Sequence, residues 1–378
     1  MRGALEPRAR GPCWHALTAP DSVSLMGAYT GERVQLGLAL LAYAGSHGEP
    51  ARSASALHEH LVDWLARLDV TRDREIVWGP VCYRLLWQSS APALIAFVTR
   101  ARADVDGALQ IVVRGGAPIG VWDPCFEELA CVDQEPWVWA RGAGNLAPAV
   151  CAGVLAQLEV LRELTPDEPL PGAGRTLLEF LAQRASASEA QGEPASAHVL
   201  GHGLGGALAC ALALWLRDTQ GSERTRELCW DPGRALRLCC TSFASPAFGN
   251  SDFATYITER LGGALELIHN PLDHAVSLWD AQAMVELEQL YKPHVERAPL
   301  LFAVVHALCE ELERRGVEYE QLPAQLLERR LNSALPPSYV AQAEYQHLHA
   351  YAEQLGLELD FDALLGRPCG TDGGPIAQ

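Results

Sequence analysis

The chain has 378 residues, of which 49% are hydrophobic, and it carries a formal net charge of −18 at pH 7. This hydrophobic content suffices for one large core, so a single domain with insertions is expected. The negative charge excludes nucleic acid as a partner, since phosphates require a basic surface, and it argues against docking to anionic lipid. No run approaches the roughly 18 consecutive apolar residues of a membrane span, so no integral membrane segment is expected.

The first twenty residues are rich in proline, arginine and glycine and lack the apolar run of a secretory signal. We therefore expect residues 1–20 to be a disordered tail and the protein to be cytoplasmic. The eleven cysteines include no Cys-X-X-Cys pair, and Cys239 and Cys240 are adjacent within an apolar run, which favours reduced, buried thiols. No histidine spacing is typical of metal ligands, so neither a metal nor a cofactor is expected.

Hydrophobic periodicity predicts two helices and then two strands in the first part of the chain. Val34–Ala44 has the apolar density of a buried helix, and Ala54–Leu68 carries apolar residues at helical spacing. Ala93–Arg100 and Leu109–Val113 are short runs typical of strands, and an Asp-Gly turn signal between them predicts a hairpin. Residues 117–150 are expected to be irregular.

From residue 149 onward, predicted helices and strands alternate. The helices are Ala149–Leu164, Gly174–Ala185, Gly205–Leu216 and Asp252–Leu261, and the strands are Ala197–Leu200, Leu236–Phe243 and Ala264–His269. This alternation favours an α/β fold with a mostly parallel central sheet and helices on both faces.

The C-terminal third is expected to be a helical extension. Its candidate helices are Ala281–Tyr291, Pro299–Arg315, Leu322–Leu331 and Ser338–Leu355. The block at about 285–337 is a helical insertion that forms either a cap over a pocket or a packed appendage. With residues 356–378 as a C-terminal tail, the single domain spans residues 21–355.

Residues 196–208 carry the most informative pattern of the chain. They are Ser-Ala-His-Val-Leu-Gly-His-Gly-Leu-Gly-Gly-Ala-Leu: an apolar run, then Gly-X-Z-X-Gly, then the start of an Ala/Leu-rich helix. This strand–turn–helix setting is typical of a nucleophile elbow, in which Z is normally serine. Here Z is Gly203, which has no hydroxyl with which to attack. The pattern therefore indicates a hydrolase scaffold without its nucleophile.

This segment resembles the class 3 lipases, the fungal-lipase-like branch of the α/β-hydrolase fold. Their elbow is typically Gly-His-Ser-Leu-Gly-Gly-Ala, which residues 201–207 match except at Gly203. Three further blocks are similar in order and spacing, at residues 109–116, 241–250 and 267–276. The resemblance extends over roughly residues 25–355. It implies a lipid or acyl-ester small molecule as substrate and hydrolysis of carboxylic esters as the ancestral activity.

The resemblance also implies the partners of the missing serine. Asp273 follows an apolar run and an Asn-Pro turn and corresponds to the orienting acid of a triad. His347, in a Gln-His pair followed by a tyrosine, is the first choice for the base, and His349 is the second. If the family's alternative spacing applies, Gln346 occupies the base position. The weaker candidates for the base are His306 and His294.

Two backbone N–H groups are implied as the oxyanion hole. Leu204, which follows the nucleophile position, supplies one, and Gly116 supplies the other from a position where the family usually has threonine or serine. Gly205 and Gly206 permit the helix to approach the sheet closely. Ser245 is a possible alternative nucleophile, but it corresponds to a residue that shapes a loop in the family.

Three explanations of Gly203 remain open. The first is a natural loss of the serine that yields a pseudo-hydrolase. The second is a substitution in an otherwise active enzyme, and the third is that the resemblance of the elbow is fortuitous. With glycine at this position we expect little or no serine-type turnover. The alternative function, from a different class, is a catalytically silent module that binds a lipid or a protein. The sequence does not specify acyl-chain length, head group or oligomeric state.

Overall fold

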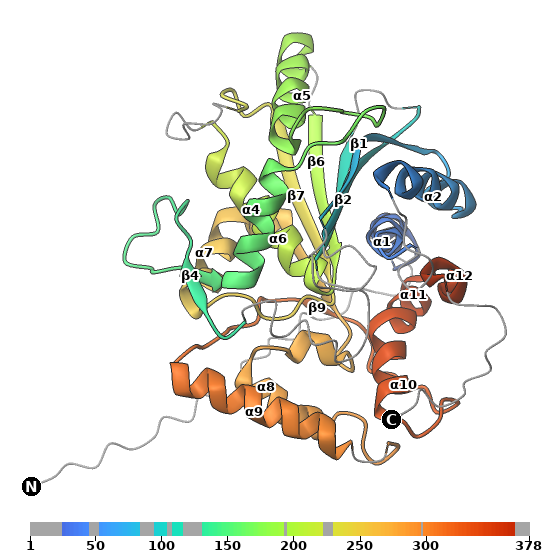
Figure 1. The fold of residues 1–378 in the computed structure, drawn as a ribbon, viewed down its shortest axis with the longest axis vertical. Coiled ribbons are helices and arrows are strands. Elements are labelled where there is room, and N and C mark those ends of the chain that lie inside the picture. The colour runs from blue at the N-terminus through green and yellow to red at the C-terminus, as the bar shows by residue number, and fades with distance from the viewer. Residues whose placement is uncertain are drawn as a thin grey trace, which may run out of the picture.

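A computed structural model describes residues 25–44, 53–83, 94–103, 108–115, 131–192, 195–221, 230–295 and 298–366. Within these residues the main sheet has seven strands in the order β1-β2-β3-β6-β7-β8-β9 (Figure 1). Their bounds are Arg74–Tyr83 (β1), Leu94–Ala101 (β2), Leu109–Gly115 (β3), Ala195–His202 (β6), Leu236–Phe243 (β7), Leu265–His269 (β8) and Gln325–Leu326 (β9). Strand β2 pairs antiparallel with both β1 and β3, and all neighbouring pairs from β3 to β9 are parallel.

Helices cover both faces of this sheet, as expected from the alternating pattern (Figure 1). The longer helices are Leu25–Leu41 (α1), Ala54–Arg67 (α2), Ala152–Glu163 (α4), Leu177–Gln191 (α5), Leu204–Thr219 (α6), Ser251–Leu261 (α7) and Pro299–Arg315 (α9). The shorter ones are Ala281–Glu286 (α8), Tyr339–Glu344 (α10), Ala350–Leu355 (α11) and Phe361–Leu365 (α12). A separate two-stranded sheet joins Gln134–Pro136 (β4) and Ala149–Cys151 (β5). No helix in the described ranges is both long and apolar enough to cross a membrane.

Alternate residues of the strands build two hydrophobic cores, one on each face of the sheet. On β3, Ile111 and Val113 point into the larger core with α4, α5 and α6, whereas Val112 between them points into the smaller core with α1, α2 and α11. Successive strand residues face opposite sides, so apolar runs on these central strands are buried on both faces.

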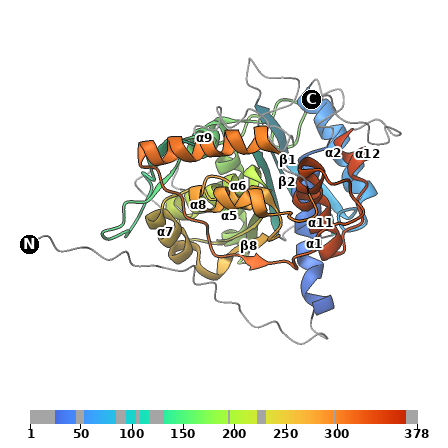
Figure 2. The same cartoon turned by 90° about the horizontal axis from the view of Figure 1, so that it is seen from below.

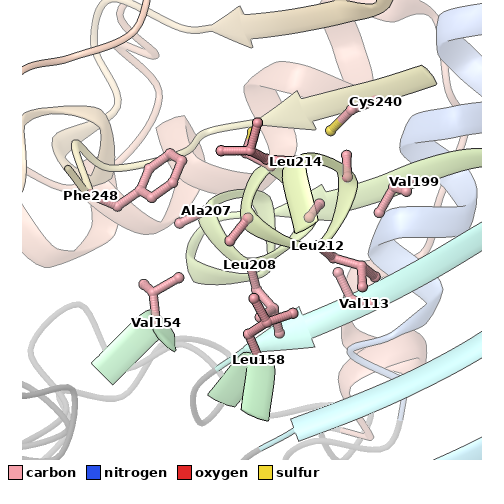
Figure 3. Close-up of a cluster of buried hydrophobic side chains, with 14 of the residues drawn as sticks. Val113, Val154, Leu158, Val199, Ala207, Leu208, Leu212, Leu214, Cys240 and Phe248 are labelled. Carbon is pink, nitrogen blue, oxygen red and sulfur yellow. The ribbon is translucent and has the colours of Figure 1, made fainter. Parts of the chain in front are cut away.

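Helix α6 is the centre of the larger core. Nearly every residue from Gly205 to Thr219 is buried, which is typical of a helix that is apolar all round. Its Leu208 and Leu212 lie among Val154 and Leu158 of α4 and the strand residue Val113 (Figure 3). This packing fixes the N-terminus of α6 against the end of β6.

In the C-terminal third, two segments differ from the expected secondary structure. Leu322–Leu331 is not a helix: Pro323 cannot donate an N–H, and the chain extends to form β9, where the Leu327 N–H donates to the His269 carbonyl at 2.8 Å. The expected tail after residue 355 instead includes α12, whose Phe361, Leu364 and Leu365 are buried in the smaller core. The expected tail at residues 1–20 lies outside the described residues.

The block after residue 280 packs at the end of the sheet where β6 finishes, with α8 and α9 below it (Figures 1 and 2). Gln321 donates through its side-chain amide to the Ser245 carbonyl at 2.9 Å and to the Val276 carbonyl at 2.8 Å. Phe302 of α9 packs its ring on Tyr339, with centroids 5.3 Å apart. The block therefore lies beside the ends of the parallel strands, where ligands of open α/β sheets bind.

Candidate active site

Gly203 occupies a sharp turn between β6 and α6. Its backbone has φ of 58° and ψ of −128°, and its N–H donates to the Phe243 carbonyl at 2.9 Å. A φ in this range is adopted readily by glycine and is strained for residues with a side chain. The backbone therefore has the strained turn of a nucleophile elbow, although no side chain projects from it.

The neighbouring glycines let α6 approach the sheet. A β carbon on Gly201 would overlap the Gly205 carbonyl, and one on Gly205 would lie 2.7 Å from the Val113 carbonyl oxygen. A β carbon on Gly206 would overlap the Ser242 hydroxyl and lie 3.0 Å from the Phe243 carbonyl oxygen. These glycines are therefore required by packing, independently of any reaction.

Asp273 and His347 are hydrogen-bonded to each other. Nδ1 of His347 lies 2.9 Å from Oδ2 and 3.1 Å from Oδ1 of Asp273. Asp273 caps the short 3₁₀-helix His274–Ser277 (η2), where it accepts the Ala275 N–H at 2.9 Å. His347 belongs to a π-helical turn, Tyr345–His349 (η4), between α10 and α11. Residues 74 positions apart in sequence thus form one buried dyad.

Burial alone raises the pKa of the Asp273 carboxyl, because it disfavours the charged form. The charge of His347 and its hydrogen bond, helped by His274 and the Ala275 N–H, outweigh burial and hold that pKa below its ordinary value. Asp273 is therefore an anion at neutral pH, and it orients the ring so that Nδ1 carries the proton and Nε2 is left as a base.

The Nε2 side of His347 faces Gly203. A β carbon built on Gly203 would lie 3.2 Å from Nε2 of His347 and 3.4 Å from the Tyr43 hydroxyl. A serine side chain at this position would thus place its hydroxyl next to the free side of the imidazole. Asp273, His347 and Gly203 are therefore adjacent.

His202 also lies at this site, and its contact with His347 was not anticipated from the sequence. It is buried, and its Nε2–H donates to the carbonyl of His347 at 2.8 Å. Burial, reinforced by His347, lowers the pKa of His202 to about 3, so this ring is neutral. Tyr43 donates its hydroxyl to the His202 carbonyl at 2.9 Å. The Gly-His pair of the elbow was the available sequence signal, whereas nothing in the sequence pointed to Tyr43.

The other candidates for the base lie elsewhere. His349 stacks between Tyr345 and Phe361, with ring centroids 5.9 Å and 4.2 Å away. Gln346 donates to the Arg330 carbonyl at 2.9 Å, and its side-chain oxygen accepts from Asn270 at 2.8 Å, which is a structural arrangement. Both weaker candidates, His294 and His306, are exposed.

The N–H of Leu204 is at the first turn of α6, where backbone donors have no acceptor within the helix and the helix dipole favours negative charge. Gly116, the other residue expected at the oxyanion, lies outside the described residues. The end of β3 approaches the start of α6, since a β carbon on Gly205 would lie 3.3 Å from the Gly115 nitrogen. Ser245 is buried, and its hydroxyl donates to the Pro246 carbonyl at 3.0 Å.

Comparison with known proteins gives a consistent picture. Residues 175–272, which include Gly203, match the family model described as lipase (class 3). The crystal structure of M37 lipase is similar with a TM-score of 0.77 and 26% sequence identity, covering 88% of this chain and 96% of that one.

Two fungal structures are more distant. Lipase II from Rhizopus niveus has a TM-score of 0.42 and 17% identity over 70% of this chain and 78% of its own. The triacylglyceride lipase of Rhizomucor miehei has a TM-score of 0.41 and 17% identity over 69% and 76%. A search of curated proteins found no match. The family match over residues 175–272 and the fold shared with M37 lipase show a lipase-like α/β-hydrolase that is similar to the class 3 lipases.

Proposed function

We propose that this site descends from one that hydrolyses carboxylic esters of acylglycerols or related lipids. In it Asp273 is the orienting acid and His347 is the base. Leu204 and Gly116 are the oxyanion donors, and Gly203 marks the lost nucleophile. The observation that carries the proposal is the hydrogen bond of His347 to Asp273, with the opposite ring nitrogen facing Gly203.

The missing hydroxyl removes the covalent step. In a complete triad, Nε2 of the base takes the serine proton as the oxygen attacks the ester carbonyl, and the protonated ring then gives that proton to the departing alcohol. Glycine cannot form the acyl-enzyme. Loss of one triad member typically lowers turnover on the order of 10⁴- to 10⁶-fold, so we expect little or no serine-type hydrolysis.

The test is hydrolysis of a short and a long p-nitrophenyl acyl ester by the native chain, Gly203→Ser and Gly203→Ala. Turnover by the serine variant alone is the expected result, because alanine tests the effect of a side chain without a hydroxyl. Inactivity of all three, with the serine variant folded, would contradict the retained dyad and oxyanion hole. Activity of the native chain that survives His347→Gln would overturn the assignment of the base.

The second candidate function is a catalytically silent module that binds a lipid, an acyl ester or a protein. Gly203 itself favours this binding function, because Asp273 and His347 are kept in a buried network around a position that has no reactive group. Binding of a non-hydrolysable ether lipid to the native chain, with no turnover by Gly203→Ser, would favour this function over the ancestral one.

We also propose that the protein is a single cytoplasmic domain. In support of the compartment, Cys210, Cys239, Cys240 and Cys309 are all reduced thiols. The thiol chemistry can be tested by counting the cysteines that react with a maleimide after denaturation without reductant. In support of one domain, the two hydrophobic cores share the same sheet.

A further inference from the structure

The hydrogen bond from His202 to the carbonyl of His347 joins two segments that are far apart in the chain. His202 is the last residue of β6 and directly precedes Gly203, whereas His347 lies 145 positions after it, in the π-helical turn. A carbonyl oxygen only accepts, so Nε2 of His202 carries the proton and donates it over 2.8 Å. Because burial lowers the pKa of His202 to about 3, the ring has a single proton near neutral pH, and this bond uses it.

His202 itself is fixed on several sides. Its carbonyl accepts the Tyr43 hydroxyl at 2.9 Å, and its backbone is paired with Phe243 in the sheet. Its ring is 1% exposed and packs edge-on against two aromatic rings. The centroid of the Tyr43 ring lies 5.7 Å away, and that of Tyr351 on α11 lies 5.6 Å away. A side chain enclosed in this way is held in one rotamer, so its N–H points in one direction.

The two hydrogen bonds to His347 fix different parts of that residue. The bond between Nδ1 and Asp273 sets the rotation of the imidazole ring. The bond between the carbonyl and His202 sets where the backbone of the turn lies relative to the elbow, and the two histidine rings are in contact, with centroids 4.5 Å apart. A correctly rotated ring on a displaced backbone does not face Gly203. Both bonds are therefore needed, because catalytic groups must be placed to within about 0.5 Å.

We propose that His202 is a positioning residue for the base: its Nε2–H holds the His347 carbonyl so that the free side of that imidazole faces Gly203. His202 acts through His347 and transfers no proton itself. The inference rests on the proposed function, because it takes His347 as the base. It adds a second role for the elbow, which anchors the base as well as presenting the nucleophile position, and this role does not require the serine.

The first test observes the Nδ1 proton of His347 in the native chain by nuclear magnetic resonance at neutral pH. Its hydrogen bond to Asp273 protects this proton from exchange with water, so a resolved resonance is expected, which His347→Gln must remove. His202→Phe keeps an aromatic ring but removes the donor, and the resonance should be lost to exchange. His202→Gln should retain it, because the amide nitrogen of glutamine can replace Nε2 as the donor.

The second test measures ester hydrolysis in the Gly203→Ser background. Adding His202→Phe should lower kcat on the order of 10- to 100-fold and leave KM nearly unchanged, because the base is misplaced while the substrate contacts remain. His202→Gln should restore most of kcat. If Gly203→Ser alone shows no turnover, the proposed function fails, whereas the resonance of the native chain still decides whether His202 positions His347.

His198→Phe is the matched control, because His198 lies on the same strand and its Nε2 is also hydrogen-bonded, to Thr241 at 2.8 Å. It should lower the urea midpoint but leave the His347 resonance unchanged, and kcat in the serine background as well. A folded His202→Phe that likewise keeps both the resonance and kcat would reduce His202 to a packing residue and refute the proposal. If His202→Phe does not fold, His202→Leu removes the same donor, and retention of the resonance in that variant would refute the proposal equally.

Discussion

The hydroxyl of Tyr351 donates to Oδ2 of Asp273 at 3.1 Å and accepts the backbone N–H of Asn270 at 2.8 Å. Asp273 is thus held from two sides, by the ring of His347 and by this tyrosine. Tyr351 lies on α11, one turn after His347, so both side chains that hold the Asp273 carboxylate come from neighbouring turns of the chain.

Replacing Tyr351 with phenylalanine tests this arrangement. The free energy of unfolding should fall by about 1–3 kcal/mol, because the buried Asn270 N–H loses its acceptor and Asp273 loses a donor. In the Gly203→Ser background, turnover should fall about tenfold, as expected when one charge-assisted hydrogen bond to the acid is lost. Tyr345→Phe is the matched control, since its hydroxyl donates to Glu353 in an exposed position. Urea unfolding and ester hydrolysis measure the two effects, and equal behaviour of both variants would contradict the role of Tyr351.

Gly203→Ser should be less stable than the native chain even if it gains activity. A side chain at φ of 58° costs about 1–2 kcal/mol, and the new β carbon lies 3.2 Å from His347, which must move by a few tenths of an ångström. Gly262→Ser separates the two causes, because its φ of 54° is similar but nothing lies within 4 Å of the added carbon. Urea midpoints should rank native, then Gly262→Ser, then Gly203→Ser. A serine variant as stable as the native chain would show that the elbow is unstrained.

The close approach of β6 and α6 predicts a severe effect of Gly201→Ala. Its β carbon would overlap the Gly205 carbonyl, and backbone cannot retreat as a flexible side chain can. We expect a loss of about 3 kcal/mol or more, or failure to fold. Gly263→Ala adds the same carbon where nothing lies within 4 Å and should change stability little. Thermal unfolding of the two variants gives the comparison, and a small effect at Gly201 would argue against the packing described for the elbow.

Stability should fall as the pH is lowered below about 6.5. Burial lowers the pKa of several histidines, to about 3 for His202 and to about 4 for His198, His269 and His274. The unfolded chain protonates these rings near their ordinary pKa of 6.5. Between that pH and the lower pKa of the folded state, the unfolded chain therefore binds more protons than the folded chain, and stability is lost toward acid pH. Glu32 acts in the opposite direction, because burial and Glu266 raise its pKa to about 7, but it is one group against four.

His198→Gln provides the measurement, because His198 lies outside the dyad on β6. The slope of unfolding free energy against pH between about 7 and 4.5 should become shallower in this variant. Identical slopes in the native chain and His198→Gln would show that the folded chain protonates this ring as readily as the unfolded chain does.

The sequence predicted the central part of the fold well, and the reasons are physical. Leu236–Phe243 and Pro299–Arg315 were predicted with the bounds that the structure has, because an apolar run bounded by polar residues and a proline-initiated amphipathic run are strong local signals. The elbow was found because glycines at fixed spacing are required by the packing of α6 on the sheet.

The elements that were missed lack such local signals. Strand β1 contains Gly79 and Pro80, which argue against a central strand but are tolerated at the sheet edge, where its register is irregular. Tyr43 reaches the site only because α1 packs against β6, a contact between residues about 160 positions apart. A contact between residues so far apart leaves no periodic pattern in the sequence from which it could be predicted.

The π-helical turn Tyr345–His349 has a consequence for the whole molecule. Tyr339 and Ala343, before the turn, pack into the larger core, whereas Leu348, Tyr351 and Leu355, after its start, pack into the smaller core on the opposite face of the sheet. One extra residue rotates the phase of an α-helix by about 100°, so the wide turn redirects the apolar stripe from one core to the other. His347 lies at this switch. Deleting one residue there would detach half of the helix from its core and turn the imidazole away from Gly203 at the same time, so the geometry of the dyad is tied to the joining of the two cores.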